Sequence, residues 1–224
     1  MPKDINSPEH NDNRSYDYSG VESEERKEYA VIESFIEGPS SVIDLGCGNG
    51  SLLHLLLQKG KCNRAVGVEI SESGVEISRK KGIDARLGRI DEPLPFGEEE
   101  FDFAICNVTI QMVMYPEILL NEMKRISKKQ IISFPNFGFY KNRIDHMMKG
   151  RMPKPVLFGY SWYSTGHIHQ LSIDDFKELI DHTGGLEIEK FSTVWPGGSL
   201  KDTLTGMFPN LFCLLPVFLL RKTA

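Results

Sequence analysis

The sequence predicts an α/β protein built around a doubly wound, mostly parallel sheet. Three observations indicate this fold class. Short apolar segments alternate with segments of helical period, glycine or proline closes most of the helices, and a glycine-rich turn follows the first apolar segment. The chain has 224 residues, 40% of them hydrophobic, which suits one large domain. We expect that domain at 21–224, after a disordered polar tail at 1–20.

The first half of the chain alternates three predicted helices with four predicted strands. Apolar residues at positions 29, 32, 35 and 36 have helical spacing, and Gly38-Pro39 ends that helix. Gly60 and Gly82 close the next two helices, and the apolar runs between them have the length of strands. The expected helices are 22–36, 52–59 and 73–81, and the expected strands are 42–45, 65–70, 83–87 and 101–106.

The second half is less regular. Pro116 suits the first position of a helix to about residue 126, and Ser172 could cap a helix through 181 that Gly184-Gly185 ends. The apolar run 211–220 has about half the length of a bilayer span, so we read it as a buried strand. Strands are expected at 130–134, 186–194 and 211–220. No helix is predicted between the last two, which should form an antiparallel edge hairpin of a seven-stranded sheet.

A glycine-rich turn, VIDLGCGNG, spans residues 42–50 at the end of the first predicted strand. Ligands of doubly wound sheets bind at this carboxyl edge, and the glycines allow close backbone approach. Asp44 precedes the first glycine by two residues, where a carboxylate would repel a pyrophosphate but suits a cationic amino group. The turn residues expected at the cofactor are Gly46, Cys47, Gly48 and Gly50.

Glu69 ends the second predicted strand, where an acid can accept hydrogen bonds from both hydroxyls of a ribose. A ligand with an adenosine ribose and a cationic amino-acid tail is S-adenosylmethionine. Its demethylated product, S-adenosylhomocysteine, would bind the same site. The alternatives are a strand-end cap at Asp44, a surface acid at Glu69, and a dinucleotide in place of this cofactor.

The segment after the third strand should reach the adenine. Ile90 could pack on the ring and offer its N–H, and Ile70 is expected at the same site. Arg89 occupies a position where sequences resembling class I methyltransferases commonly have an acid, and a guanidinium has no acceptor. Asp91 could supply the missing acceptor. If Arg89 instead weakens adenine binding, Arg89→Asp should tighten it.

Asn107, Thr109 and Gln111 follow the fourth strand. The end of that strand should direct them toward the cofactor, with Asn107 in contact with it and the other two orienting a methyl acceptor. None of the three is a good base near neutral pH, so no catalytic residue is assigned. Local turn chemistry is the alternative role.

Residues 135–170 form a long insert without a clear period, and eight aromatic residues occur between 134 and 163. This aromatic content argues against disorder, so the insert should fold over the ligand edge as a lid or present a surface to a partner. Its basic residues fit a solvated face or an acidic partner. His167 and His169 alternate, but no cysteine or acidic neighbour completes a zinc set, and no metal site is expected.

Several motifs together resemble the methionine biosynthesis protein MetW family. They are SFPNFG at 133–138, GRMP at 150–153, Trp162-Tyr163, Ile168-His169, the glycine turn, GVEI at 67–70 and Thr109-x-Gln111. The resemblance covers roughly residues 25–222, and the long N-terminal tail and Arg89 depart from the pattern. It implies a class I methyltransferase fold whose cofactor residues are those named above. It also implies a family-specific insert with Asn136, Arg143, Arg151, Trp162 and His169 as its polar and aromatic residues.

MetW proteins are associated with homoserine O-acyltransferase. The resemblance therefore implies an S-adenosylmethionine-binding protein that acts with or regulates that enzyme in methionine biosynthesis. The alternative is a true methyltransferase on a small-molecule acceptor, because transfer to a nucleophilic atom needs positioning more than a base. A degenerate fold without a ligand is a third hypothesis, which the intact turn and Glu69 disfavour. Whether the protein is an enzyme stays open.

Composition narrows the remaining possibilities. The net charge of −5 gives no global electrostatic reason to expect a nucleic-acid partner. The N-terminus has no apolar signal segment, and four cysteines without CxxC spacing fit a reducing compartment. We therefore expect a cytoplasmic protein with no membrane attachment.

Overall fold

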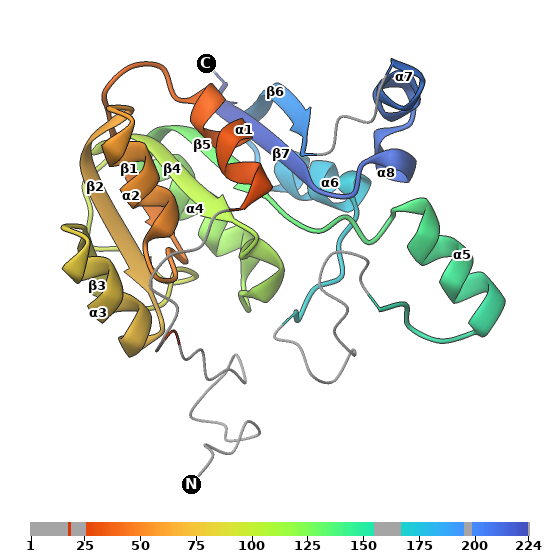
Figure 1. Cartoon of the computed structure of the whole chain (residues 1–224), viewed down its shortest axis with the longest axis horizontal. Helices are drawn as coiled ribbons and strands as arrows, with labels where there is room; N and C mark the ends of the chain where they lie inside the picture. The colour runs from red at the N-terminus through yellow and green to blue at the C-terminus, as the bar shows by residue number, and fades with distance from the viewer. Residues whose placement is uncertain (1–17, 19–25, 155–166, 195–198, 224) are drawn as a thin grey trace, which may run out of the picture.

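The computed structural model describes residues 18, 26–154, 167–194 and 199–223. One seven-stranded sheet crosses the molecule in the order β3-β2-β1-β4-β5-β7-β6 (Figure 1). The predicted fold class is confirmed, including the number of strands and the antiparallel edge. No helix of the described residues is long and apolar enough to cross a membrane.

Five strands form the parallel part of the sheet. They are β1 (Ser40–Leu45), β2 (Cys62–Glu69), β3 (Asp84–Leu87), β4 (Phe101–Asn107) and β5 (Ser127–Ser133). β1 is central and pairs with β2 on one side and β4 on the other. Its side chains are buried on both faces, which explains why the neighbouring residues Val42 and Ile43 are both apolar rather than alternating with exposed polar residues.

The antiparallel part consists of β6 (Leu186–Thr193) and β7 (Pro216–Lys222), with β7 inserted between β5 and β6. The prediction that no helix separates these strands is wrong, since α7 (Ser199–Met207) and α8 (Pro209–Phe212) lie between them. The predicted strand 211–220 is an apolar run that Pro216 interrupts. Proline cannot donate a ladder hydrogen bond in a strand interior, and β7 accordingly begins at Pro216.

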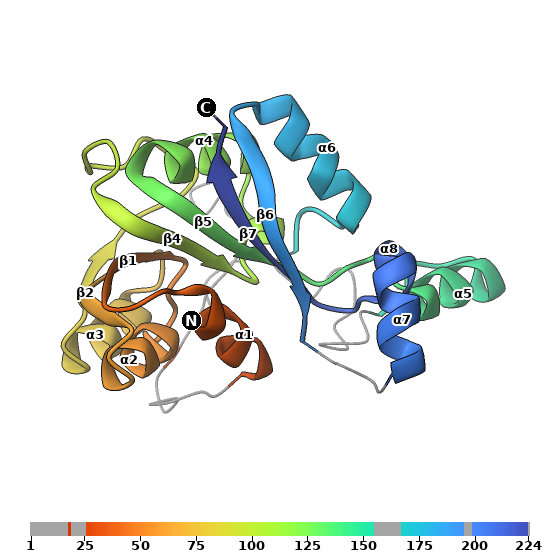
Figure 2. The ribbon, with the colours of Figure 1, turned by 90° about the horizontal axis from the view of Figure 1, so that it is seen from above.

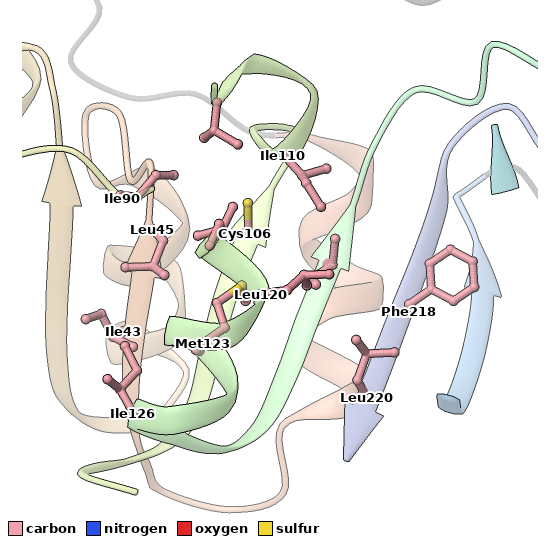
Figure 3. Close-up of a cluster of buried hydrophobic side chains, with 14 of the residues drawn as sticks. Ile43, Leu45, Ile90, Cys106, Ile110, Leu120, Met123, Ile126, Phe218 and Leu220 are labelled. Carbon is pink, nitrogen blue, oxygen red and sulfur yellow. The ribbon is translucent and has the colours of Figure 1, made fainter. Parts of the chain in front are cut away.

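Helices cover both faces of the sheet (Figure 2). α1 (Lys27–Phe35), α2 (Ser51–Gln58) and α3 (Glu72–Lys80) cover one face, and α4 (Pro116–Ile126) and α6 (Ile173–Thr183) cover the other. The helix predicted from Pro116 has the expected bounds, and Ser172 caps α6 in a capping box with Asp175. Figure 3 shows one of the two hydrophobic cores, in which Leu120 and Met123 of α4 lie among strand residues such as Leu45 and Cys106.

The insert after β5 contains a helix that the sequence did not predict, α5 (Tyr140–Lys149). Asn142 is its only buried residue, so no apolar stripe of helical period faces the core. α5 projects away from the sheet beyond α8 (Figures 1 and 2). After residue 154 the described structure resumes at residue 167, and the last residues of the insert lead into α6.

Candidate functional site

The glycine turn connects β1 to α2 at the carboxyl edge of the sheet. Gly46 has φ +86°, and a Cβ there would lie 2.6 Å from Cγ2 of Thr109. Gly48 has φ +55°, and a Cβ there would lie 3.0 Å from the hydroxyl oxygen of Tyr18. Both positions combine a left-handed backbone with a close neighbour, so the turn can be built only from glycine at these points.

Asp44 is buried next to this turn, with 3% of its surface exposed. Its Oδ1 atom is buried and has no hydrogen-bond partner among the described residues. Burial raises the pKa of the Asp44 carboxyl to about 7, the Glu69 carboxylate adds to the rise, and Arg26 opposes it. A buried, unpaired carboxylate is costly unless a cation or donor reaches it. Asp44 therefore fits the amino group of a ligand bound at the end of β1.

Glu69 joins the turn to the start of α3. Its Oε2 accepts from the N–H of Gly48 at 2.8 Å, and its Oε1 accepts from the N–H groups of Ile70 and Ser71, both at 2.9 Å. The carboxylate is 5% exposed at the end of β2, the position from which an acid can bind ribose hydroxyls. These backbone donors fix its orientation beside the turn.

Tyr18 also belongs to the site, although it lies far from the turn in sequence. Its N–H donates to Oγ of Ser73 at 2.9 Å, and its ring packs close to the Cα atoms of Gly48 and Gly74. A described residue of the N-terminal segment therefore lies against both the glycine turn and the first turn of α3. The sequence predicts a disordered tail at 1–20, in which Tyr18 could reach the cofactor; the rest of that tail lies outside the described residues.

The side chains of Cys47 and Ile90 are both buried, and the N–H of Cys47 donates to the Val68 carbonyl at 3.2 Å. A Cβ added at Gly67 would lie 2.5 Å from Sγ of Cys47, which shows that this thiol points into the sheet. Its burial raises the thiol pKa well above the usual range, so it is no nucleophile. The Ile90 side chain lies in the core beside Leu45 (Figure 3), which leaves its N–H as the group to offer a ligand. Ile70, which was also expected at the site, is 40% exposed just after the end of β2.

Asp91, expected to supply the acceptor missing at Arg89, has one carboxylate oxygen engaged within the protein. Oδ2 of Asp91 accepts from the Arg89 guanidinium at 3.0 Å and from the N–H groups of Met114 and Tyr115 at 2.8 and 3.3 Å. Arg89 also contacts Glu92 at 3.1 Å. The Asp91 carboxylate therefore connects the segment after β3 to the start of α4, and Arg89 is its ion-pair partner.

Asn107 at the end of β4 takes part in a network that the sequence did not predict. Its Oδ1 accepts from Oγ of Ser133 at 2.5 Å, and its Nδ2 donates to the buried Glu28 of α1 at 3.3 Å. Glu28 is also 3.9 Å from Arg26, the cation that lowers the Asp44 pKa. Glu28 and Arg26 were not predicted at the site. The helical period at the start of α1 does not show that the acid at position 28 faces the sheet.

Thr109 and Gln111 follow Asn107 and meet the insert. Thr109 donates to the Asn107 carbonyl at 3.0 Å and packs on Gly46. The carbonyl of Gln111 accepts from the N–H groups of Ile168 and His169 at 2.9 and 3.0 Å. Oε1 of Gln111 and Nε2 of His169 are both buried without hydrogen-bond partners among the described residues. The structure thus places the segment that contains His169 against the loop that follows β4.

The other insert residues lie elsewhere. Asn136 is buried and donates to the carbonyls of Asn210 and Cys213 at 3.0 and 2.7 Å, so it joins the insert to α8. Arg143 and Arg151 are exposed on and after α5. Trp162 lies outside the described residues. The described structure therefore brings His169, but not Asn136, to the loop beside the glycine turn.

Comparison with known proteins agrees with this architecture. A family model described as methionine biosynthesis protein MetW matches residues 26–220. The bifunctional methionine biosynthesis protein MetXA/MetW of Rhodopirellula baltica is 35% identical over 162 residues, which cover 68% of this chain and 26% of that protein. The chain spans about a quarter to a half of the length of the curated relatives it matches.

Solved structures show the same fold at low sequence identity. An S-adenosylmethionine-dependent methyltransferase from Mesorhizobium loti has a TM-score of 0.62 at 15% identity and covers 88% of this chain and 98% of its own. Magnesium protoporphyrin IX methyltransferase from Synechocystis, solved with bound S-adenosylhomocysteine, has a TM-score of 0.60 at 15% identity, with coverages of 87% and 82%.

Proposed function

Because this chain belongs to the MetW family of methionine biosynthesis proteins, we propose that it binds S-adenosylmethionine and acts with, or regulates, homoserine O-acyltransferase. Its family supports a role in methionine biosynthesis, and the fold that it shares with solved methyltransferases supports binding of the cofactor. The acyltransferase and the effect of the cofactor on it are the parts that need an experiment.

Asp44 carries the cofactor part of the proposal. A buried carboxylate with one unpartnered oxygen lies beside a glycine turn, and a second buried acid, Glu69, is held at the end of the neighbouring strand. These groups match the amino group and the ribose of S-adenosylmethionine, whose sulfonium supplies an electrophilic methyl group when it is bound. Asp44 would hold the amino group, Glu69 the ribose, and the Ile90 N–H the adenine.

The partner part rests on the Rhodopirellula baltica relative, whose name joins MetXA and MetW in one bifunctional chain. Two activities in one chain act at a fixed, short distance from each other, and the same pairing is expected between separate chains that associate. S-adenosylmethionine would then report the output of methionine synthesis to the acyltransferase. This requires the acyltransferase to bind the loaded and unloaded forms with different affinity, because equal affinities shift no equilibrium.

A second candidate function is methyl transfer to a small molecule. Gln111 Oε1 and His169 Nε2 support it, because both atoms are buried without a partner among the described residues, and the backbone of His169 bonds to that of Gln111. A polar acceptor molecule could bind these atoms, and its own nucleophile would then need orientation rather than a strong base. Under this hypothesis the protein needs no acyltransferase to be active.

The deciding experiment measures the rate of homoserine O-acyltransferase from the same source. The enzyme is assayed alone and with this protein, at zero and saturating S-adenosylmethionine. We expect the protein to change the rate and the cofactor to modify that change. Asp44→Ala and Glu69→Ala, both expected to abolish cofactor binding, should remove the cofactor effect and leave the protein effect. No change of rate in any condition would refute the acyltransferase function and favour the methyltransferase.

A further inference from the structure

Exposed apolar side chains concentrate at the end of the molecule formed by α5 and the end of α7. Met147, Met148 and Met207 are 75%, 73% and 65% exposed, the three highest values among the large hydrophobic residues described. Ile144 and Met152 are exposed beside the first two along the chain. We call Ile144, Met147, Met148 and Met152 the α5 face. Contiguous exposed apolar groups on a soluble protein indicate an interaction site.

Among the residues that the structure describes, the contacts that attach α5 to the rest of the protein come from its first turn. Tyr140 packs on the ring of Phe212 in α8, and Asn142 is directed back to the carbonyls of Asn136 and Phe137. The remaining turns extend from the body, as Figures 1 and 2 show for α5. A ten-residue helix is marginal in water without tertiary packing, so α5 gains stability when a partner covers its apolar face.

The α5 face has a basic border. Residues 140–154 contain Lys141, Arg143, Lys149, Arg151 and Lys154 against one acid, Asp145, a net charge of 5 − 1 = +4. The whole chain has a net charge of −5, so the other residues carry −9. A local charge of opposite sign to the rest of the protein selects a partner whose contact surface is acidic.

Methionine is well suited to such a contact. Its unbranched, polarizable side chain adapts to the shape of a partner, and methionine and arginine are both enriched in protein interfaces. The bifunctional relative keeps an MetXA part and an MetW part in one chain, which supports an acyltransferase as the occupant rather than a lipid surface.

We propose that the α5 face is the docking surface for homoserine O-acyltransferase, with the basic residues around it facing an acidic border on that enzyme. This inference rests on the proposed function and adds the place of contact. It assigns the insert after β5 to partner binding, while the carboxyl edge of the sheet binds the cofactor. The segment from β5 to α5 connects the two surfaces. Ser133 at its start donates to Asn107 at the carboxyl edge of the sheet, and Asn136 donates to the carbonyl of Asn210 in α8.

The test compares the dissociation constant of the acyltransferase for the wild-type chain and for the double variant Met147→Asp/Met148→Asp. Two acids on the apolar face should weaken binding at least tenfold and abolish the effect on the acyltransferase rate. Stabilisation by S-adenosylmethionine should be unchanged, because neither methionine contacts the cofactor site. Ile188→Asp, at an exposed apolar residue of β6, is the matched control and should bind like the wild type.

A second variant tests the charge. Arg151→Glu/Lys154→Glu should slow association and reduce its dependence on salt while leaving both methionines in place. If the wild type binds the acyltransferase and both variants bind equally well, the α5 face is not the docking surface and the proposed function still stands. If the wild type does not bind the acyltransferase at all, both proposals fail.

Two further outcomes would assign the face to another occupant. Sedimentation of the protein alone would show a dimer that the methionine variant converts to a monomer if the occupant were a second copy. Phosphatidylglycerol vesicles would retain the wild type and release the variant if the occupant were an anionic membrane. Either result, without acyltransferase binding, overturns the proposal.

Discussion

Asp44→Asn should make the ligand-free protein more stable while removing its affinity for the cofactor. The Asp44 carboxyl is buried and has an oxygen without a partner. Its pKa is about 7 in the folded protein and 3.8 in the reference state. The unfolded chain therefore ionises at lower pH than the folded one, and stability is lost as pH rises from about 4 to about 7.

The magnitude follows from the two pKa values. Their difference is about 3.2, and at about 1.36 kcal/mol for each pKa unit the ionised Asp44 costs about 4 kcal/mol above pH 7. At pH 5 the cost is about 2 kcal/mol, from the difference between 5 and 3.8. A neutral amide removes this cost but introduces its own buried polar groups, at about 1–2 kcal/mol. We expect a net gain of about 2–3 kcal/mol at pH 8 and about zero at pH 5.

The assay is urea unfolding of the ligand-free wild type and Asp44→Asn at several pH values between 4 and 8, followed by thermal shift with S-adenosylmethionine. The stability difference should grow with pH up to about 7 and then stay constant. S-adenosylmethionine should raise the melting temperature of the wild type alone. Parallel pH curves for the two proteins would refute the proposed ionisation of Asp44, and an equal thermal shift would refute its role in binding.

Four further predictions concern the site and its surroundings. Affinity for S-adenosylmethionine should fall about tenfold for each pH unit below 7, because protonated Asp44 offers the amino group no charge; a flat Kd between pH 5.5 and 7 would contradict this. Gly46→Ala should cost about 2 kcal/mol of stability, and adding Thr109→Ala should recover part of it in urea unfolding, because the Thr109 methyl and hydroxyl cause most of the clash. Arg89→Asp should lower the free energy of unfolding by about 1–3 kcal/mol, because Asp91 and Glu92 lose their cation; scanning calorimetry measures this loss. Titration calorimetry with S-adenosylmethionine measures separately whether binding tightens, as expected from sequence. Asn136→Ala should speed hydrogen exchange in residues 209–213 but not in β1, since its amide holds two carbonyls of that segment.

Much of the site could be predicted because it depends on local order along the chain. A parallel strand buried on both faces must be apolar, and the turn after it must use glycine where φ is positive, as at Gly46. Asp44 and Glu69 were found because each ends a strand, and parallel strands bring their carboxyl ends to one edge.

The irregular elements could not be predicted in the same way. α5 has no apolar stripe toward the core, and its only buried residue is the polar Asn142, so the usual periodicity is missing. The apolar run at 211–220 was read as one strand, whereas its first residues belong to α8 and Pro216 begins β7. A short apolar run does not distinguish helix from strand by periodicity.

The order of strands and helices from β1 to β5, the glycine turn and the two acids could be predicted from the chain, because these follow from backbone conformation and burial near each residue. Which polar groups meet depends on the packing of the folded protein. Asp91 accepts from the N–H of Met114, 23 positions along the chain, Glu28 reaches Asn107 across 79 positions, and Tyr18 lies on the glycine turn. Such contacts join residues far apart in the chain, and each depends on where two separate elements pack, which no local pattern of residues records.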